Sequence, residues 1–193
     1  GNVGEIMIVA FAMLAGAPLP LLPLQILYLN VISDVFPALA LGLGKGQPGV
    51  MNRPPRDRDE PIITSQHWLG ILGYGLLISA SVLAAFWLAL DRYDMSQESA
   101  VATAFLTLAF ARTWHVLNMR DRASGLFVNE VTRNPYVWIA ILISLGLLVA
   151  AILLEPLASV LKLAPPTFLA WRLILGFSAV PLLVVQVTKE LWR

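Results

Sequence analysis

The amino-acid sequence predicts an all-α fold, a polytopic membrane helix bundle of six transmembrane segments. Hydrophobic residues make up 58% of the chain and charged residues only 13%, with a mean hydropathy of +0.76, whereas a soluble domain carries about a quarter charged residues. Apolar stretches of about 20 residues, the length that crosses a bilayer as a helix, recur along the chain. Basic residues collect in alternate connections between these stretches. These three observations indicate a chain that crosses the membrane several times.

The composition also limits the possible kinds of site and partner. The chain has no cysteine, which excludes a disulfide framework and a thiolate metal site. Its net charge of +1 says nothing about partners; we expect a surrounding lipid bilayer and no nucleic acid. The chain opens on Gly1, and its first residues, GNVGEIMIVAFAML, already have the pattern of a membrane helix. We therefore expect it to be a fragment of a longer protein.

The first two predicted segments come from one apolar stretch. Ile6 to Leu43 is too long for a single span. The sequence PLPLLP at 18–23 divides it, because proline breaks a helix. The predicted spans cover residues 1–17 and 21–44.

The third and fourth segments differ in character. The span predicted at 67–90 contains an unbroken stretch from Trp68 without a charge. The span predicted at 99–118 is interrupted by Arg112 and His115.

The last two segments have clear ends. The span at 135–154 begins at Asn134-Pro135, a helix start signal, and ends before Glu155. The span at 167–190 contains Arg172 about one turn from its end, where a long side chain reaches the interface.

Loop charges predict the orientation of the bundle. The connections at 45–66 and 119–134, with the tail after 188, hold nine basic residues, and the opposite loops hold two. The nine are Lys45, Arg53, Arg56, Arg58, Arg120, Arg122, Arg133, Lys189 and Arg193, and the two are Arg92 and Lys162. Because basic loops stay in the cytoplasm, we expect both ends of the chain and both of these loops to be cytoplasmic.

A polar cluster inside the second span needs a functional explanation. Asn30, Ser33 and Asp34 share one helical face within an apolar run, and an ionisable side chain at this depth is costly. Pro37 removes a backbone hydrogen bond and is expected to free a carbonyl near Ser33. Carboxylate, amide, hydroxyl and carbonyl oxygens suit a dehydrated cation. The alternative is a network of hydrogen bonds between helices that holds no ion.

Two further groups of polar residues lie in other spans. Asn2 and Glu5 fall on one face of the first segment, at a depth that the sequence leaves open. Arg112 lies fourteen residues into its span, and a buried carboxylate is its natural partner. His115 follows three residues later and is interpreted as an interfacial residue rather than a ligand.

These residues together resemble the C-terminal membrane region of the cation-transporting P-type ATPases, the group that contains the calcium and sodium/potassium pumps. NVGE at 2–5 resembles the fifth helix of the calcium pumps, and PLQILYLNVISDVFPALALG at 23–42 resembles the sixth. MNRPPR at 51–56 and EPII at 60–63 resemble the loop that follows. Four further spans then correspond to helices seven to ten, so the resemblance covers essentially the whole chain.

The resemblance implies a set of ion ligands. It implies that five residues contribute oxygens to the transported-ion site: Asn2, Glu5, Asn30, Ser33 and Asp34. Ser33 stands where calcium pumps often carry threonine, which keeps a hydroxyl. Val35 stands where many of them carry glycine, a change expected to stiffen or narrow the site.

Arg112 is the main departure from the family pattern. It falls where calcium pumps with two ion sites carry a glutamate ligand, and a guanidinium cannot bind a metal ion. We hypothesise that one of two sites is lost, that Arg112 is a counter-charge to Glu5 or Asp34, and that one ion moves per cycle. The expected cargo is calcium, then magnesium or manganese, then sodium or protons.

The resemblance also implies a larger parent protein. The chain contains no DKTGT phosphorylation sequence and alone cannot hydrolyse ATP. ATP and magnesium would act in the phosphorylation, nucleotide-binding and actuator domains of a parent P-type ATPase. The first four helices would also belong to that parent, and the fourth supplies another site carboxylate in the family. The plasma membrane is expected rather than an organelle. The rival interpretations are a channel or secondary transporter that uses Asp34, and a membrane scaffold that transports nothing.

Overall fold

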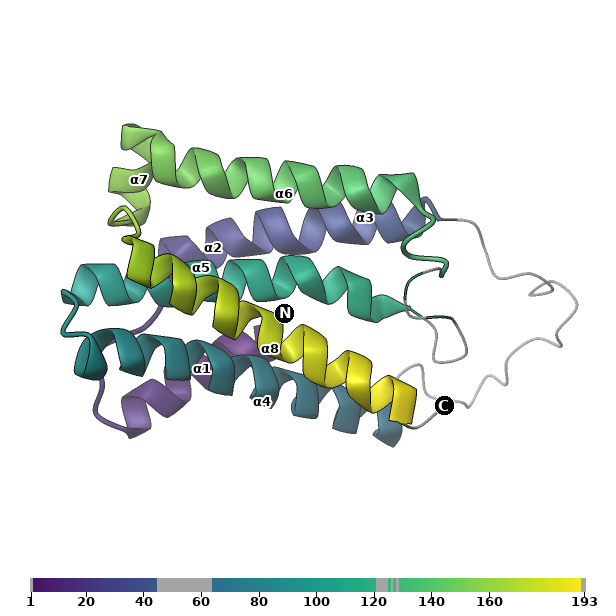
Figure 1. The fold of residues 1–193 in the computed structure, drawn as a ribbon, viewed down its shortest axis with the longest axis horizontal. Helices are drawn as coiled ribbons and strands as arrows, with labels where there is room; N and C mark the ends of the chain where they lie inside the picture. Colours follow the sequence, from purple (N-terminus) through teal and green to yellow (C-terminus); the bar gives the residue numbers. More distant parts are fainter. Residues whose placement is uncertain (1, 45–63, 121–124, 126, 128, 192–193) are drawn as a thin grey trace, which may run out of the picture.

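A computed structural model of the chain describes residues 2–44, 64–120, 125, 127 and 129–191. Within these residues every regular element is a helix (Figure 1), so the predicted all-α fold is confirmed. Five described helical runs are long and apolar enough to cross a membrane: Pro23–Gly42, His67–Arg92, Gln97–Met119, Pro135–Leu153 and Phe168–Leu191. The first predicted segment forms a shorter apolar helix, Asn2–Leu14. The chain is an integral, multi-pass membrane protein.

The N-terminal apolar stretch forms two antiparallel rods. The first is α1 (Asn2–Leu14); the second is a continuous run of α2 (Pro23–Leu29), the π-helical turn η1 (Asn30–Val35) and α3 (Phe36–Gly42). Gly16 follows α1 with a positive φ of 67°, a conformation that glycine adopts without strain. The chain therefore turns at the proline-rich sequence, as predicted.

Four more helices complete the bundle. They are α4 (Ser65–Trp87), which continues into the π-helical η3 (Leu88–Arg92); α5 (Gln97–His115), which continues into the 3-10 turn η4 (Val116–Met119); α6 (Pro135–Leu153); and α8 (Phe168–Leu191). A short helix, α7 (Glu155–Leu161), connects α6 to α8 and ends at Lys162, whose φ is 51°. Asn134 is the N-cap of α6: its side chain accepts a hydrogen bond from the backbone N–H of Tyr136 at 3.0 Å, as expected for a residue at this position.

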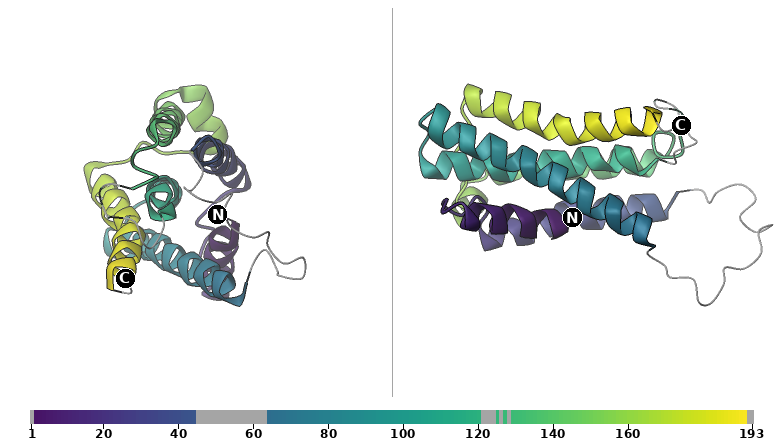
Figure 2. Two further views of the ribbon diagram at one scale, coloured as in Figure 1. Left: turned by 90° about the vertical axis from the view of Figure 1, so that its right-hand side faces the viewer. Right: turned by 90° about the horizontal axis from the view of Figure 1, so that it is seen from below.

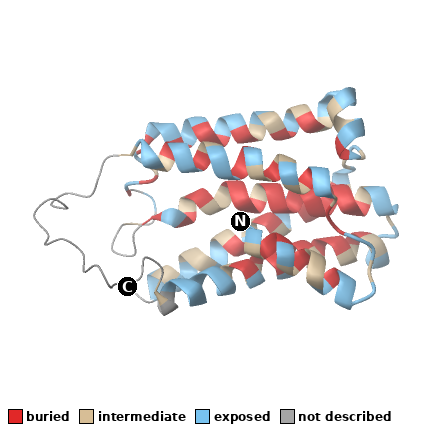
Figure 3. Ribbon diagram, turned by 180° about the vertical axis from the view of Figure 1, so that it is seen from behind, coloured by how far each residue is buried: buried red, intermediate tan, exposed pale blue. Residues whose placement is uncertain are grey.

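Helix α5 lies at the centre of the bundle. Seen end-on in Figure 2, left, it is surrounded by the other rods, and it contacts α4, α6, α8 and η1. Most of its residues are buried, and the buried positions in Figure 3 concentrate along it. Small side chains let neighbouring membrane helices approach closely, and α5 carries Ala100, Ala102, Ala104, Ala109 and Ala111. Most of the helix that carries Arg112 is thus covered by its neighbours.

Helices α1 and α4 meet at two glycines. A Cβ at Gly75 would lie 3.7 Å from the backbone nitrogen of Gly4 and 3.2 Å from a methyl carbon of Val3. Ser79 donates a hydrogen bond to the carbonyl oxygen of Gly4 at 3.0 Å. This close approach fixes the position of α1, and therefore of Glu5, against the rest of the bundle.

The connections divide between the two ends of the bundle. Arg120, Arg133 and Lys189 lie at the end where α5 and α8 finish and α6 begins, whereas Arg92 and Lys162 lie at the opposite end (Figure 1). The loop sequence at 51–61, and with it most of the loop predicted at 45–66, lies outside the described residues.

Candidate cation site

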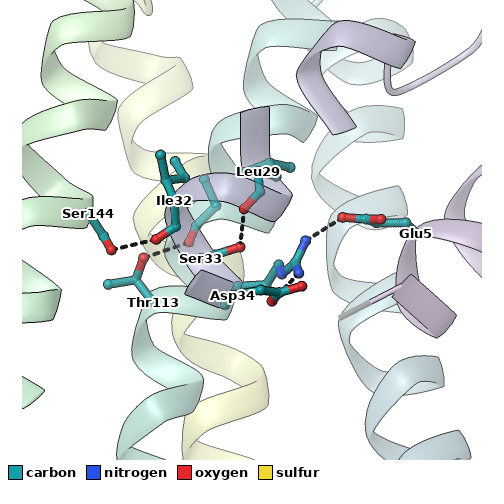
Figure 4. A network of polar contacts seen from close by, with 9 residues as sticks. Glu5, Leu29, Ile32, Ser33, Asp34, Thr113 and Ser144 are labelled. Carbon is teal, nitrogen blue, oxygen red and sulfur yellow. Dashed lines mark hydrogen bonds and ion pairs between the residues drawn. The ribbon is translucent and has the colours of Figure 1, made fainter. Parts of the chain in front are cut away.

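The π-helical turn η1 shapes the second span at the predicted polar cluster. Pro37 has no N–H to complete the backbone ladder of this turn. The carbonyl oxygen of Ile32 instead accepts a hydrogen bond from the hydroxyl of Ser144 on α6, at 2.8 Å (Figure 4). The expected release of a carbonyl near Ser33 is thus observed at the preceding residue, where a neighbouring helix satisfies it.

Arg112 joins the two carboxylates of the predicted site. Its Nη1 pairs with Oε1 of Glu5, and its Nη2 pairs with Oδ1 of Asp34 (Figure 4). The three side chains come from α5, α1 and η1, so one guanidinium connects three separate segments. The sequence suggested Arg112 as a counter-charge to Glu5 or Asp34, and in the structure its guanidinium pairs with both carboxylates.

Glu5, Asp34 and Arg112 form a charged triad, and burying charged side chains is energetically costly. The side chains of Glu5 and Arg112 are each 5% exposed, whereas that of Asp34 is 46% exposed. Two carboxylates and one guanidinium leave one formal negative charge. A buried ion pair is stable only while both partners are present, because a single unpaired charge in this environment is costly. Asp34 is the one exposed member of the three.

The other predicted ligands occupy different positions. The Asn30 side-chain oxygen is buried and has no hydrogen-bond partner in the described part of the chain, so it is available as a ligand. Ser33 donates its hydroxyl to the carbonyl oxygen of Leu29 at 2.6 Å, and its oxygen still has lone pairs. Asn2 is exposed, one turn before Glu5 on α1, and lies outside the triad.

A cavity of about 1120 Å³ borders the triad, and Asp34 and Arg112 form part of its wall. Tyr74, His115 and Asn118 also line it. The rings of Tyr74 and His115 stack with their centroids 3.8 Å apart. The Tyr74 hydroxyl, the His115 Nδ1 and both polar atoms of the Asn118 side chain are buried without a hydrogen-bond partner among the described residues.

Not all of these residues were predicted from the sequence. Tyr74 and Ser144 were missed, although a polar atom inside an apolar span is the signal that identified Asp34. His115, interpreted as interfacial, is half-buried against Tyr74. Across the described ranges, no three histidine, cysteine, aspartate or glutamate side chains converge as a ready-made metal cage.

Comparison with known proteins places this architecture in a family. Residues 18–191 match the family described as cation transporting ATPase, C-terminus. The chain belongs to the C-terminal family of cation-transporting ATPases. This matches the resemblance found in the sequence, and the matched residues include η1 and Arg112 and run through α8.

Bacterial proteins are similar to this cation-transporting ATPase C-terminal region over nearly its whole length. A calcium-transporting ATPase of Bacillus subtilis is 35% identical over 93% of this chain and 20% of its own length. Calcium-transporting ATPases of Bacillus cereus and Listeria monocytogenes are each 30% identical, over 97% and 98% of this chain and 23% and 21% of their own lengths. The chain thus spans about a fifth of the length of these relatives.

Proposed function

We propose that this chain is the membrane part of an ATP-driven cation pump and supplies part of its intramembrane cation site. The observation that carries the proposal is the convergence of Glu5 and Asp34 on Arg112 inside a bundle of the cation-transporting ATPase family. Asp34, with the buried oxygen of Asn30, offers the hard ligands that calcium prefers. The names of the similar bacterial proteins also support calcium as the cargo.

Arg112 determines how many ions the site takes. Its guanidinium lies between the carboxylates, where it excludes a second metal ion and compensates one of the two negative charges. A further carboxylate from the fourth helix of a parent pump would bring the site to two negative charges. One divalent cation neutralises that charge, so the pump moves one calcium ion per cycle. The five ligands are Asn2, Glu5, Asn30, Ser33 and Asp34, with Asn2 entering the site only when the parent's helices are present.

The remaining parts of the pump lie elsewhere in the parent chain. Both ends of this region face the cytoplasm, a topology supported by Arg120, Arg133 and Lys189 at one end of the bundle. The parent's first helices cover the cavity beside Asp34, where several buried polar atoms have no hydrogen-bond partner among the described residues. Phosphorylation in the cytoplasmic domains then moves the helices and changes the side of the membrane from which the cation reaches the site. This is a coupling between two distant sites. The plasma membrane is the proposed location.

The test is made on the full-length pump. Asp34→Asn keeps the side-chain shape but removes the negative charge, and it should abolish calcium-stimulated phosphorylation by ATP while membrane insertion stays intact. Asp91→Asn is the matched control, because Asp91 is exposed at the opposite end of the bundle, and its calcium dependence should be unchanged. Unaltered calcium dependence in Asp34→Asn would remove Asp34 from the site. Calcium movement without ATP would instead favour a channel or secondary transporter.

A further inference from the structure

A second cavity, of about 660 Å³, lies on the outer side of the bundle between the start of α6 and the end of α8. Its wall contains Leu117, Trp138, Leu182 and Leu183, and its polar residues include Arg133 and Gln186. It shares no lining residue with the cavity beside Asp34. Its size is in the range of about 300–1,000 Å³ that holds a small-molecule ligand.

The apolar wall of this groove faces the bilayer. Trp138 is 46% exposed on α6 and Leu183 is 59% exposed on α8, and both helices are candidate membrane spans. Water does not cover such a surface in a membrane. The chemistry of the wall fits a hydrocarbon chain that runs along α8.

Hydrogen bonds hold the polar rim of the groove in place. The Trp138 indole nitrogen donates a hydrogen bond to the carbonyl oxygen of Thr132 at 2.9 Å. The Gln186 side chain accepts a hydrogen bond from Nε of Arg120 at 2.9 Å and donates one to the carbonyl oxygen of Leu117 at 3.2 Å. These bonds fix the indole ring and the base of the groove before any ligand arrives.

Arg133 gives the groove a positive charge, which favours a negatively charged ligand. It precedes the first residue of α6 by two positions, at the level where a span ends, and its side chain is exposed. It makes no ion pair with the described residues around it. A guanidinium binds phosphate through paired hydrogen bonds, and tryptophan favours the same headgroup depth.

We propose that this groove binds one anionic phospholipid, with its phosphate on Arg133 and an acyl chain against Trp138 and Leu183. The charge of the rim and the apolar wall together match a lipid with a negative headgroup better than a neutral one. The basic residues at this end of the bundle favour the anionic leaflet for the same reason. The lipid covers the otherwise exposed groove between α6 and α8.

The experiment measures lipid retention by native mass spectrometry. The full-length protein is extracted from nanodiscs that contain equal amounts of dioleoyl phosphatidylglycerol and dioleoyl phosphatidylcholine. The unchanged protein should keep one phosphatidylglycerol in preference to phosphatidylcholine. Arg133→Gln should reduce this preference about tenfold, the loss expected when a charge-assisted hydrogen bond is removed. Leu183→Trp should fill the groove and remove both lipids.

Arg172→Gln is the matched control, because Arg172 is also exposed at a span end but lies near the start of α8, away from the groove. Its lipid preference should equal that of the unchanged protein. The thermal unfolding temperature of each variant is also measured, and equal values show that the variants are folded. Equal retention of the two lipids by the unchanged protein would assign the groove to ordinary annular lipid and overturn the proposal. The same loss in Arg172→Gln as in Arg133→Gln would also overturn it, because it would indicate a general effect of surface charge.

Discussion

Ser144 on α6 donates its hydroxyl hydrogen to the carbonyl oxygen of Ile32 in the π-helical turn η1, across 2.8 Å. In a π-helix this carbonyl would bond the N–H five residues later, and that residue is Pro37, which has none. Ser144 therefore replaces a backbone donor that the sequence lacks. The bond ties α6 to the turn that carries Asp34.

Replacing Ser144 with alanine should destabilise the bundle. The Ile32 carbonyl would remain buried without a donor, at a cost of about 1–3 kcal/mol. Thermal unfolding in detergent should report a lower midpoint temperature. Ser159→Ala is the control, because Ser159 is exposed on α7, and a surface change of this kind alters stability by about 0.5 kcal/mol or less. Equal midpoints for the two variants would contradict the role given to Ser144.

Replacing Arg112 with glutamine should have a larger effect. The change leaves Glu5 and Asp34 without their shared cation, and breaking a buried ion pair costs about 3–5 kcal/mol. Millimolar calcium should recover part of this stability, because a bound cation would compensate the same carboxylates. The unfolding temperature is measured with and without calcium. Arg172→Gln, at an exposed position, should show neither the loss nor the recovery.

The contact of α1 with α4 should not tolerate a large side chain at Gly75. Even a Cβ there would lie 3.2 Å from Val3 and 3.6 Å from the sulfur of Met7. Gly75→Leu should push the helices apart and cost about 1–3 kcal/mol. Gly70→Leu is a matched control on the same helix, since a Cβ at Gly70 meets nothing within 4 Å. Cysteine cross-linking between α1 and α4 should weaken only in the Gly75 variant.

Gln25 should hold the start of α2 against α7. Its buried side chain donates to the carbonyl oxygen of Leu161 at 2.9 Å and accepts from the backbone N–H of Leu22 at 3.0 Å. Gln25→Leu should leave both groups unpaired and increase amide hydrogen exchange in α7. Gln97→Leu, at the exposed first residue of α5, should leave exchange in α7 unchanged. Unaltered exchange in both variants would show that α7 is held by other contacts.

Much of the fold is predictable because its signals are local. Long apolar runs, the proline cluster before α2 and the Asn134-Pro135 start of α6 each act within one segment. The site was predictable only in part. Arg112 implied a buried carboxylate partner, but the depth of Glu5 follows from the contact between Gly4 and Gly75, which joins distant parts of the chain.

The π-helical turn and the stacked rings lay beyond sequence reasoning. A proline predicts a weakened ladder, but which carbonyl is released depends on the position of Ser144 on another helix. The stacking of Tyr74 on His115 likewise depends on how α4 crosses α5. Neither arrangement has a signature in the local sequence. Such tertiary contacts can be identified only when the positions of the helices relative to one another are known.

The fixed charge of Arg112 has a consequence for the energetics of the proposed pump. Helix α5 is the central rod, so its guanidinium stays in the membrane when the transported ion leaves. The empty triad then carries one net negative charge instead of two. Moving an elementary charge through the membrane potential involves about 2.3 kcal/mol per 100 mV. With the further carboxylate proposed from the parent's fourth helix, the emptied site carries two net negative charges instead of three. The arginine therefore weakens the influence of voltage on any return step in which these carboxylates change their electrical exposure, so the emptied site resets under a wider range of membrane potentials.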